Sequence, residues 1–172
     1  MSVVLDGSAG ITLPDNGALS TSVGDVIVVS STGAVTTPYQ PSFYASPNVN
    51  TTGANTTYIK MSFQAALHNI GNHYNTSTSL FTAPVAGSYQ FNTNVRFDVF
   101  AGSYHIIMLY KNGTNISGSY AISQASGSYN TLNLSAVVDL QVNDAISVYL
   151  YGNGDSSWAT SGHSSFSGYL LG

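Results

Sequence analysis

The sequence predicts an all-β protein, an antiparallel sandwich or jelly roll preceded by a short β arm. Three observations support this fold class. Only 6% of the 172 residues are charged, and every acidic residue is Asp, whereas ordinary domains have about 25% charged residues. The sequence uses Ser, Thr, Asn, Gly and twelve Tyr in place of the Glu, Lys and Ala that are typical of helix surfaces. Segments of alternating polarity recur roughly every 10–15 residues between turn signals, and no long segment has a helical period.

Composition and charge exclude several classes of protein. The net charge is −4 and no basic run exists, which argues against nucleic-acid binding. No apolar run approaches the ~18 residues that a membrane helix needs. The N-terminus lacks the features of a signal peptide, so we expect no export. Cysteine is absent, which excludes disulfides and thiolate metal sites, and 43% hydrophobic residues argue against disorder.

Residues 1–40 form the predicted N-terminal arm. Short apolar pieces such as Val26–Val29 are bounded there by Gly, Pro, Asn and Asp, which mark tight turns. Such pieces need a partner sheet or sister chains, so the arm is expected to serve attachment or trimerisation. Residues 41–57 contain Pro, Asn, Ser and Thr and are interpreted as a linker. The apolar residues expected to make the attachment are Val3, Val4, Leu5, Ile11 and Leu13.

Residues 58–172 carry the strands of the predicted jelly roll. Ile59–Leu67 alternates with period two, as does 89–99, so each is predicted as a strand with one buried face. His105–Tyr110 is apolar on both faces, which predicts a central strand. Lys111–Gly113 then provides a hairpin turn. Three further strands are predicted at 132–140, 145–151 and 166–171.

Four blocks of sequence, in order, are similar to the globular head of complement C1q. The family pattern is matched at Phe63–Phe91, Leu109–Gly113, Val138–Val148 and Phe166–Leu170, the last with Tyr169 as its second aromatic residue. The C1q family shares a ten-stranded jelly roll with tumour necrosis factor, so the resemblance implies a C1q/TNF-like jelly-roll domain over residues 58–172. It also implies a homotrimer.

The collagen-like stalk of animal C1q proteins is absent from this sequence. Gly10–Gly17 instead resembles segments of bacteriophage fibre proteins. Together the two resemblances imply a non-enzymatic phage structural protein at the virion surface, made in the cytoplasm of the host bacterium. The leading function is a capsid decoration or cement protein anchored by its arm to capsid or tail proteins. The alternatives are a short tail fibre or receptor-binding tip, and a bacterial lectin-like adhesive module. A host surface receptor or a glycan is a further expected partner.

No catalytic group is expected, although Ser, His and Asp are all present. The nearest approach to a nucleophile elbow, Gly162–Phe166, lacks its second Gly and leads into a strand rather than a helix. His68 and His73 are five residues apart across a predicted turn, which does not suit a metal pair. His105 is expected to cap a core strand. A three-fold axis that gathers three copies of one His remains an alternative.

No cofactor or metal ion is expected either. Calcium requires clustered oxygen ligands, and Asp139, Asp144 and Asp155 are dispersed over two loops. The alternative to a calcium site is that each Asp sits in an ordinary turn and bonds its own backbone.

Aromatic residues provide the remaining candidates. Tyr129 and Trp158 lie beside small polar residues in predicted surface loops, where amphipathic rings suit recognition of a receptor or glycan. The alternative for Trp158 is that it covers one end of the jelly roll. Spare aromatic residues on the outward strand faces favour burial in a trimer; these are Tyr104, Tyr110, Tyr149 and Tyr169.

Overall fold

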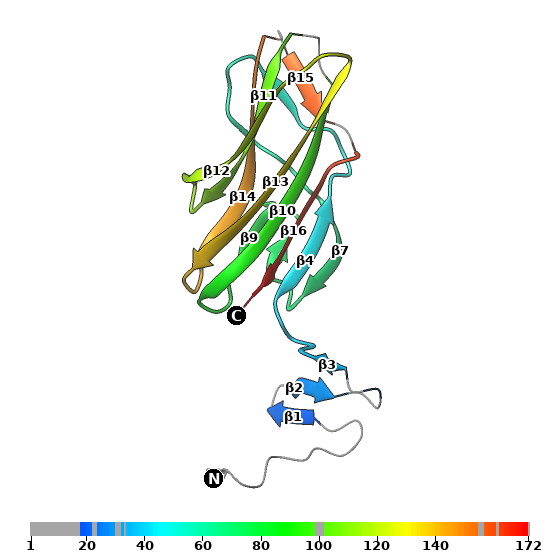
Figure 1. The fold of residues 1–172 in the computed structure, drawn as a ribbon, viewed down its shortest axis with the longest axis vertical. Helices are drawn as coiled ribbons and strands as arrows, with labels where there is room; N and C mark the ends of the chain where they lie inside the picture. The colour runs from blue at the N-terminus through cyan, green and yellow to red at the C-terminus, as the bar shows by residue number, and fades with distance from the viewer. Residues whose placement is uncertain are drawn as a thin grey trace. The chain divides into compact units, whose positions relative to one another are not determined.

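The computed structural model describes residues 18–21, 24–29, 32, 34–98, 102–154, 157–160 and 162–171. The chain divides into two compact units, Met1–Gln40 and Pro41–Gly172. The described part of the first unit is an antiparallel sheet in which β2 lies between β1 and β3 (Figure 1). Its strands are β1 (Ala18–Thr21), β2 (Gly24–Val29) and β3 (Val35–Thr36). The predicted attachment residues Val3, Val4, Leu5, Ile11 and Leu13 lie outside the described residues.

The second unit is a sandwich of two antiparallel sheets, and the predicted all-β class is confirmed (Figure 1). The first sheet has the order β5-β15-β10-β16-β4-β7, and β13 pairs with the other edge of β10. The second sheet has the order β12-β11-β14-β9-β8, and β6 also pairs with β14. In the described part of the chain, no helix is long and apolar enough to cross a membrane.

The first sheet consists of β4 (Ser42–Ser46), β5 (Thr52–Ala54), β7 (Ala65–Ile70), β10 (Gly87–Asp98), β13 (Tyr129–Leu140), β15 (Ser157–Thr160) and β16 (Ser165–Leu170). The second sheet consists of β6 (Ile59–Lys60), β8 (Tyr74–Asn75), β9 (Leu80–Thr82), β11 (Tyr104–Lys111), β12 (Thr114–Gln124) and β14 (Ala145–Asn153).

An aromatic cluster fills the space between the sheets. Phe43 of β4 stacks on Tyr74 at 4.6 Å between ring centroids and meets Phe166 of β16 edge-on at 4.9 Å. Phe81 and Phe91 complete the cluster, at 5.2 Å and 6.4 Å from Phe43. Each ring buries roughly 150–250 Å², so these residues dominate the packing energy of the domain. Burial also raises the pKa of Tyr74 to about 12, which keeps its phenol protonated in the core.

The hairpin between β11 and β12 follows the prediction. Lys111 pairs with Thr114, and the two residues between them, Asn112 and Gly113, have φ angles of 52° and 78°. A two-residue hairpin turn needs positive φ at both positions, and Asn followed by Gly meets that need at the lowest strain. β11 is a central strand of its sheet, flanked by β12 and β14, as predicted.

The segment predicted as one strand over Ile59–Leu67 is two strands in different sheets. Its first part is β6 of the second sheet, and its last part belongs to β7 of the first sheet. Met61 and Phe63 are buried as the chain crosses between the sheets, which keeps the apolar alternation without a continuous ladder. Leu67 is 72% exposed, not buried, because the β4–β7 register shifts there: Tyr44 pairs with His68 and the next residue with Ala66.

The range 41–57, interpreted from the sequence as a linker, contains β4 and β5. The strand β4 lies between β16 and β7 in the interior of the first sheet, and β5 pairs with β15. The sandwich therefore begins near Pro41 rather than at Tyr58.

Candidate binding surfaces

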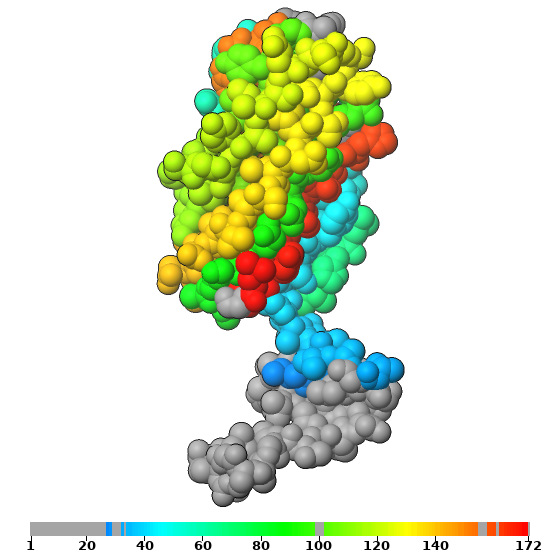
Figure 2. All heavy atoms as spheres, viewed as in Figure 1, coloured from blue at the N-terminus to red at the C-terminus, as the bar shows by residue number. Residues whose placement is uncertain are grey.

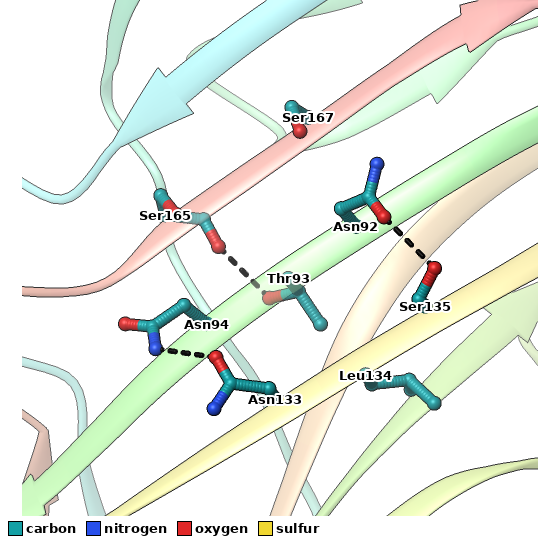
Figure 3. A pocket seen from close by; sticks show the side chains of 8 residues that line it. All are labelled: Asn92, Thr93, Asn94, Asn133, Leu134, Ser135, Ser165 and Ser167. Carbon is teal, nitrogen blue, oxygen red and sulfur yellow. Dashed lines mark hydrogen bonds between the residues drawn. The ribbon is translucent and has the colours of Figure 1, made fainter.

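A network of amide and hydroxyl side chains covers the outward face of the first sheet (Figure 3). Ser135 Oγ donates to Asn92 Oδ1 at 2.9 Å, and Gln90 Nε2 donates to Ser135 Oγ at 2.9 Å. Two residue pairs further along the ladder, Asn94 Nδ2 donates to Asn133 Oδ1 at 2.7 Å. We call these five residues of β10 and β13 the amide face. These hydrogen bonds pair several of the polar groups with one another, and the five residues carry no charge.

A hollow of about 290 Å³ lies over this network, between β13, β10 and β16. Two serine side chains of β16 line one side of it. Thr93 Oγ1 donates to the backbone oxygen of Ser165 at 2.9 Å, which ties β10 to β16 beneath the hollow (Figure 3). The lining residues are Asn92, Thr93, Asn94, Asn133, Leu134, Ser135, Ser165 and Ser167.

Exposed apolar residues border the amide face. Val137 is 57% exposed and pairs with Gln90, whose other neighbour across the sheet is Tyr169 at 44% exposure. Tyr44, at 41% exposure, pairs with Ser167 in the next row. Figure 2 shows β13, β10, β16 and β4 as neighbouring diagonal bands on one side of the molecule. A neutral face whose polar groups bond one another, with an apolar border, loses little on leaving water.

Of the two residues predicted to recognise a receptor or glycan, one is exposed in the structure and the other is buried. Tyr129 is 62% exposed at the start of β13, and the Arg96 guanidinium lies 4.5 Å from its ring centroid. Trp158 is only 2% exposed, so the structure contradicts its assignment to a surface loop. Its indole packs on the backbone at Gly53 and Gly152, where an added Cβ would lie 2.0 Å and 2.4 Å from the ring. Trp158 therefore seals one end of the sandwich, the alternative that the sequence left open.

The four tyrosines predicted to favour a trimer do not share one surface. Tyr169 borders the amide face of the first sheet. Tyr104, Tyr110 and Tyr149 lie on β11 and β14, on the outward face of the second sheet. The alternation of each strand was visible in the sequence, but the sheet to which each strand belongs was not.

The histidines and the serine near the last strand occupy structural positions. His68 Nε2 lies 2.8 Å from Ser42 Oγ across the β4–β7 ladder. His105, the second residue of β11, is fully buried, with its ring 4.6 Å from that of Phe97, which fits the predicted place at the end of a core strand. Ser164 is 3% exposed, and its Oγ accepts the backbone N–H of Arg96 at 3.1 Å. Among the described residues no group of three or more His, Cys, Asp or Glu is placed to hold a metal ion.

Asp144 organises the turn between β13 and β14. Its carboxylate accepts hydrogen bonds from Lys111 Nζ and Asn112 Nδ2, both at 2.7 Å, and from the backbone N–H of Gln141 at 2.8 Å. These donors, the Lys111 ammonium foremost, lower the pKa of Asp144 to about 2. The Gln141 bond is the local turn contact that the sequence offered as the alternative to calcium. Asp155 lies outside the described residues.

Replacing Asp144 by Asn should lower the free energy of unfolding at neutral pH and do less in acid. The folded-state pKa of about 2 lies below the usual value near 3.8, so the carboxylate stabilises the fold above about pH 4, and this contribution is lost as pH falls through 2. Urea unfolding at pH 7, 4 and 2 checks this result. The control is Asp98→Asn, which removes an exposed pair with Arg96 and should have little effect at any pH. An equal loss for D144N at pH 2 and pH 7 would contradict the electrostatic explanation.

The similarity of the chain to known proteins covers the whole sandwich. Residues 42–171 match the C1q domain family. The chain is 33% identical over 118 residues to the collagen alpha-1(X) chain of Mus musculus, and the match covers 63% of this chain but only 16% of that collagen. The chain therefore matches only a small part of that collagen chain.

Solved structures of the same fold are similar over 77% of this chain. The globular domain of zebrafish complement 1qA protein has a TM-score of 0.58 at 17% identity and is covered over 98% of its length. Murine APRIL at pH 5.0 has a TM-score of 0.59 at 15% identity and is covered over 99%. At these identities the similarity establishes the fold, which confirms the predicted C1q/TNF-like jelly roll. Because the C1q match extends over most of its length, the chain belongs to the C1q domain family.

Proposed function

We propose that the protein is a non-enzymatic homotrimer assembled through the amide face of its jelly roll. C1q/TNF-like domains form homotrimers, and the complement, collagen and cytokine families that carry them are generally non-enzymatic. The single observation that carries this assignment is the amide face itself. It is neutral, its polar groups bond one another, and Val137 and Tyr169 border it with exposed apolar surface.

We further propose that the trimer decorates a phage virion and is anchored by residues 1–40. The similar proteins reported above are vertebrate, so this role rests on the resemblance of Gly10–Gly17 to phage fibre segments and on the separate first unit. A sheet as small as β1-β2-β3 has little core of its own, and its strand edges suit pairing with a capsid protein. A short tail fibre or receptor-binding tip is the second candidate, favoured by the exposed Tyr129.

Deleting residues 1–40 should leave the jelly roll folded and trimeric but abolish its attachment to virions. The remaining chain retains both sheets of the sandwich and its core. Purified virions that lack the protein would be incubated with full-length or truncated protein, sedimented and analysed by mass spectrometry. Circular dichroism and sedimentation velocity of the truncated protein provide the folding control. Equal virion binding by both forms would place the attachment surface on the jelly roll, and absence of the full-length protein from virions would refute the virion role.

A further inference from the structure

The outward face of the second sheet carries half of the tyrosines of the chain. Six of the twelve Tyr lie on β11, β12 and β14 or just before β6, and all six lie on the side of the sheet away from the core. We call this set the tyrosine platform. It consists of Tyr58, Tyr104, Tyr110, Tyr120, Tyr149 and Tyr151.

The alternation of β11 separates the platform from the core. Ile107 and Leu109 are buried between the sheets, at 0% and 1% exposure. Ile106 and Met108 point the other way and lie across from Tyr151 and Tyr149 of β14. On the other side of β11, the same two residues pair with Ile122 and Tyr120 of β12, which are 54% and 57% exposed. The platform is therefore a continuous outward surface of phenol rings with aliphatic side chains between them.

Five of the six rings of the platform contact one another, Tyr120 being the exception. Tyr110 and Tyr149 stack with centroids 3.9 Å apart and planes 21° from parallel. Tyr151 contacts Tyr58 at 4.7 Å and Tyr104 at 6.1 Å. At the edge of the platform, Asn153 Nδ2 donates to the Tyr104 hydroxyl at 3.2 Å. Rings fixed in this way lose little conformational entropy when a ligand binds.

The platform carries little charge, although Lys60 of β6 pairs with Tyr149 and therefore shares its outward face. The Lys and Arg residues on the described strands of the second sheet are Lys60 and Lys111, and these strands carry no Asp or Glu. Lys60 Nζ donates to the backbone oxygen of Thr78 at 2.8 Å, and Lys111 Nζ bonds Asp144 at 2.7 Å. Burial, together with the neighbouring phenols of Tyr58 and Tyr149, raises the pKa of Tyr110, so its hydroxyl stays protonated at neutral pH. On the described strands of the second sheet, an anionic ligand finds a counter-charge on this face only at Lys60, whereas an uncharged ligand loses no ion hydration on binding.

We propose that the tyrosine platform is a binding site for a neutral oligosaccharide. A pyranose ring presents an apolar C–H face and a border of hydroxyls, and the platform presents aromatic rings that end in phenol hydroxyls. A second copy of this chain would set phenol hydroxyls against phenol hydroxyls. A sugar instead supplies C–H groups to the rings and hydrogen-bond partners to the hydroxyls. The platform lies on the opposite sheet from the amide face, so trimer assembly leaves it free. The inference goes beyond the proposed structural role and does not depend on a virion.

The test uses the full-length protein and neutral hexasaccharides of glucose, mannose, galactose and N-acetylglucosamine, with a sulfated heparin hexasaccharide as the charged probe. Calorimetric titration to 10 mM should show binding of at least one neutral probe and none of the heparin probe. Y58S and Y120S, which change tyrosines that are 54% and 57% exposed, should weaken binding at least ~10-fold. The matched controls Y39S and V49S change exposed residues outside both the platform and the amide face, at 55% and 61%, and should bind as the wild type does.

A second, chemical measurement uses the unmodified protein, so its result does not depend on the variants folding correctly. Nitration of the unmodified protein, read by mass spectrometry, should be slowed at Tyr58 and Tyr120 by a bound neutral hexasaccharide, with Tyr39 unaffected. Three results would overturn the proposal. They are the absence of binding by every neutral probe, equal weakening by the control variants, and self-association beyond a trimer that Y120S abolishes without any sugar binding. The last result would make a second copy of the chain the occupant.

Discussion

Replacing Gly168 by Val should be among the most destabilising single changes in the jelly roll. Gly168 lies on β16 and pairs with Phe91 of β10 on one side and Phe43 of β4 on the other. A Cβ added there would lie 2.6 Å from Phe91 Cδ1 and 2.9 Å from Phe43 Cε1. Both rings are packed in the aromatic cluster and all three strands are fixed by ladders, so neither side has space to yield. We expect a loss of about 3 kcal/mol, the upper end of ordinary overpacking costs.

Thermal unfolding followed by circular dichroism measures this loss, and a decrease in Tm of roughly 10 °C is expected. The matched control is Gly127→Val in the loop before β13, where an added Cβ meets nothing within 4 Å. That variant should unfold within ~0.5 kcal/mol of the wild type. If the two glycine variants had equal stability, the packing of Phe43 and Phe91 around Gly168 would be wrong.

The sequence was informative where side-chain alternation and turn chemistry act locally. The strand predicted at 89–99 is β10, and its alternation correctly separated buried Phe91 from the outward Asn92. The Asn112–Gly113 turn was predictable because positive φ is a property of those two residues alone. Local rules of this kind identified the fold class and most of the long strands.

Elements that depend on distant partners were missed. The strand β4 reads as part of a Pro-containing linker because its ladders are made with β16, more than a hundred residues later, and with β7. The strand β12 carries small polar residues and a glycine at position 118 with φ of 80°. Its sequence therefore lacks the sustained apolar alternation from which a strand is predicted. It is nevertheless held on β11 from Tyr104 to Lys111.

The binding surfaces illustrate the same limit. Composition showed that tyrosines were abundant, and alternation showed that some of them face outward. Whether Tyr169 and Tyr149 share a surface depends on which sheet receives each strand, and that assignment is a property of the topology. Trp158 was misplaced for a related reason. Its small polar neighbours are typical of a loop, but Gly53 and Gly152, from two other strands, make the space that buries it.

The assignment of the trimer interface to the amide face predicts opposite outcomes for two matched variants. Val137 lies on the outward face of β13 beside the amide network and is 57% exposed. Ile122 lies on the outward face of β12 in the second sheet and is 54% exposed. Arg at either position is tolerated in an isolated domain because both side chains reach solvent. In the assembled trimer, Val137→Arg would bury three guanidinium groups beside the amide network, and the carboxylate of Asp139, two residues along β13 on the same face, already accepts a hydrogen bond from Ser88, so the loss of hydration is costly.

We therefore expect V137R to weaken trimer assembly at least ~100-fold, equivalent to about 2.7 kcal/mol, while I122R remains trimeric. Sedimentation equilibrium from about 1 to 100 μM, with circular dichroism to show that both variants are folded, measures the difference. The wild type should be a trimer throughout this range, and a stable wild-type monomer would refute the homotrimer. If I122R dissociated and V137R did not, the interface would lie on the second sheet. The tyrosine platform would then be covered by a neighbouring protomer, and the oligosaccharide site proposed there would be lost with it.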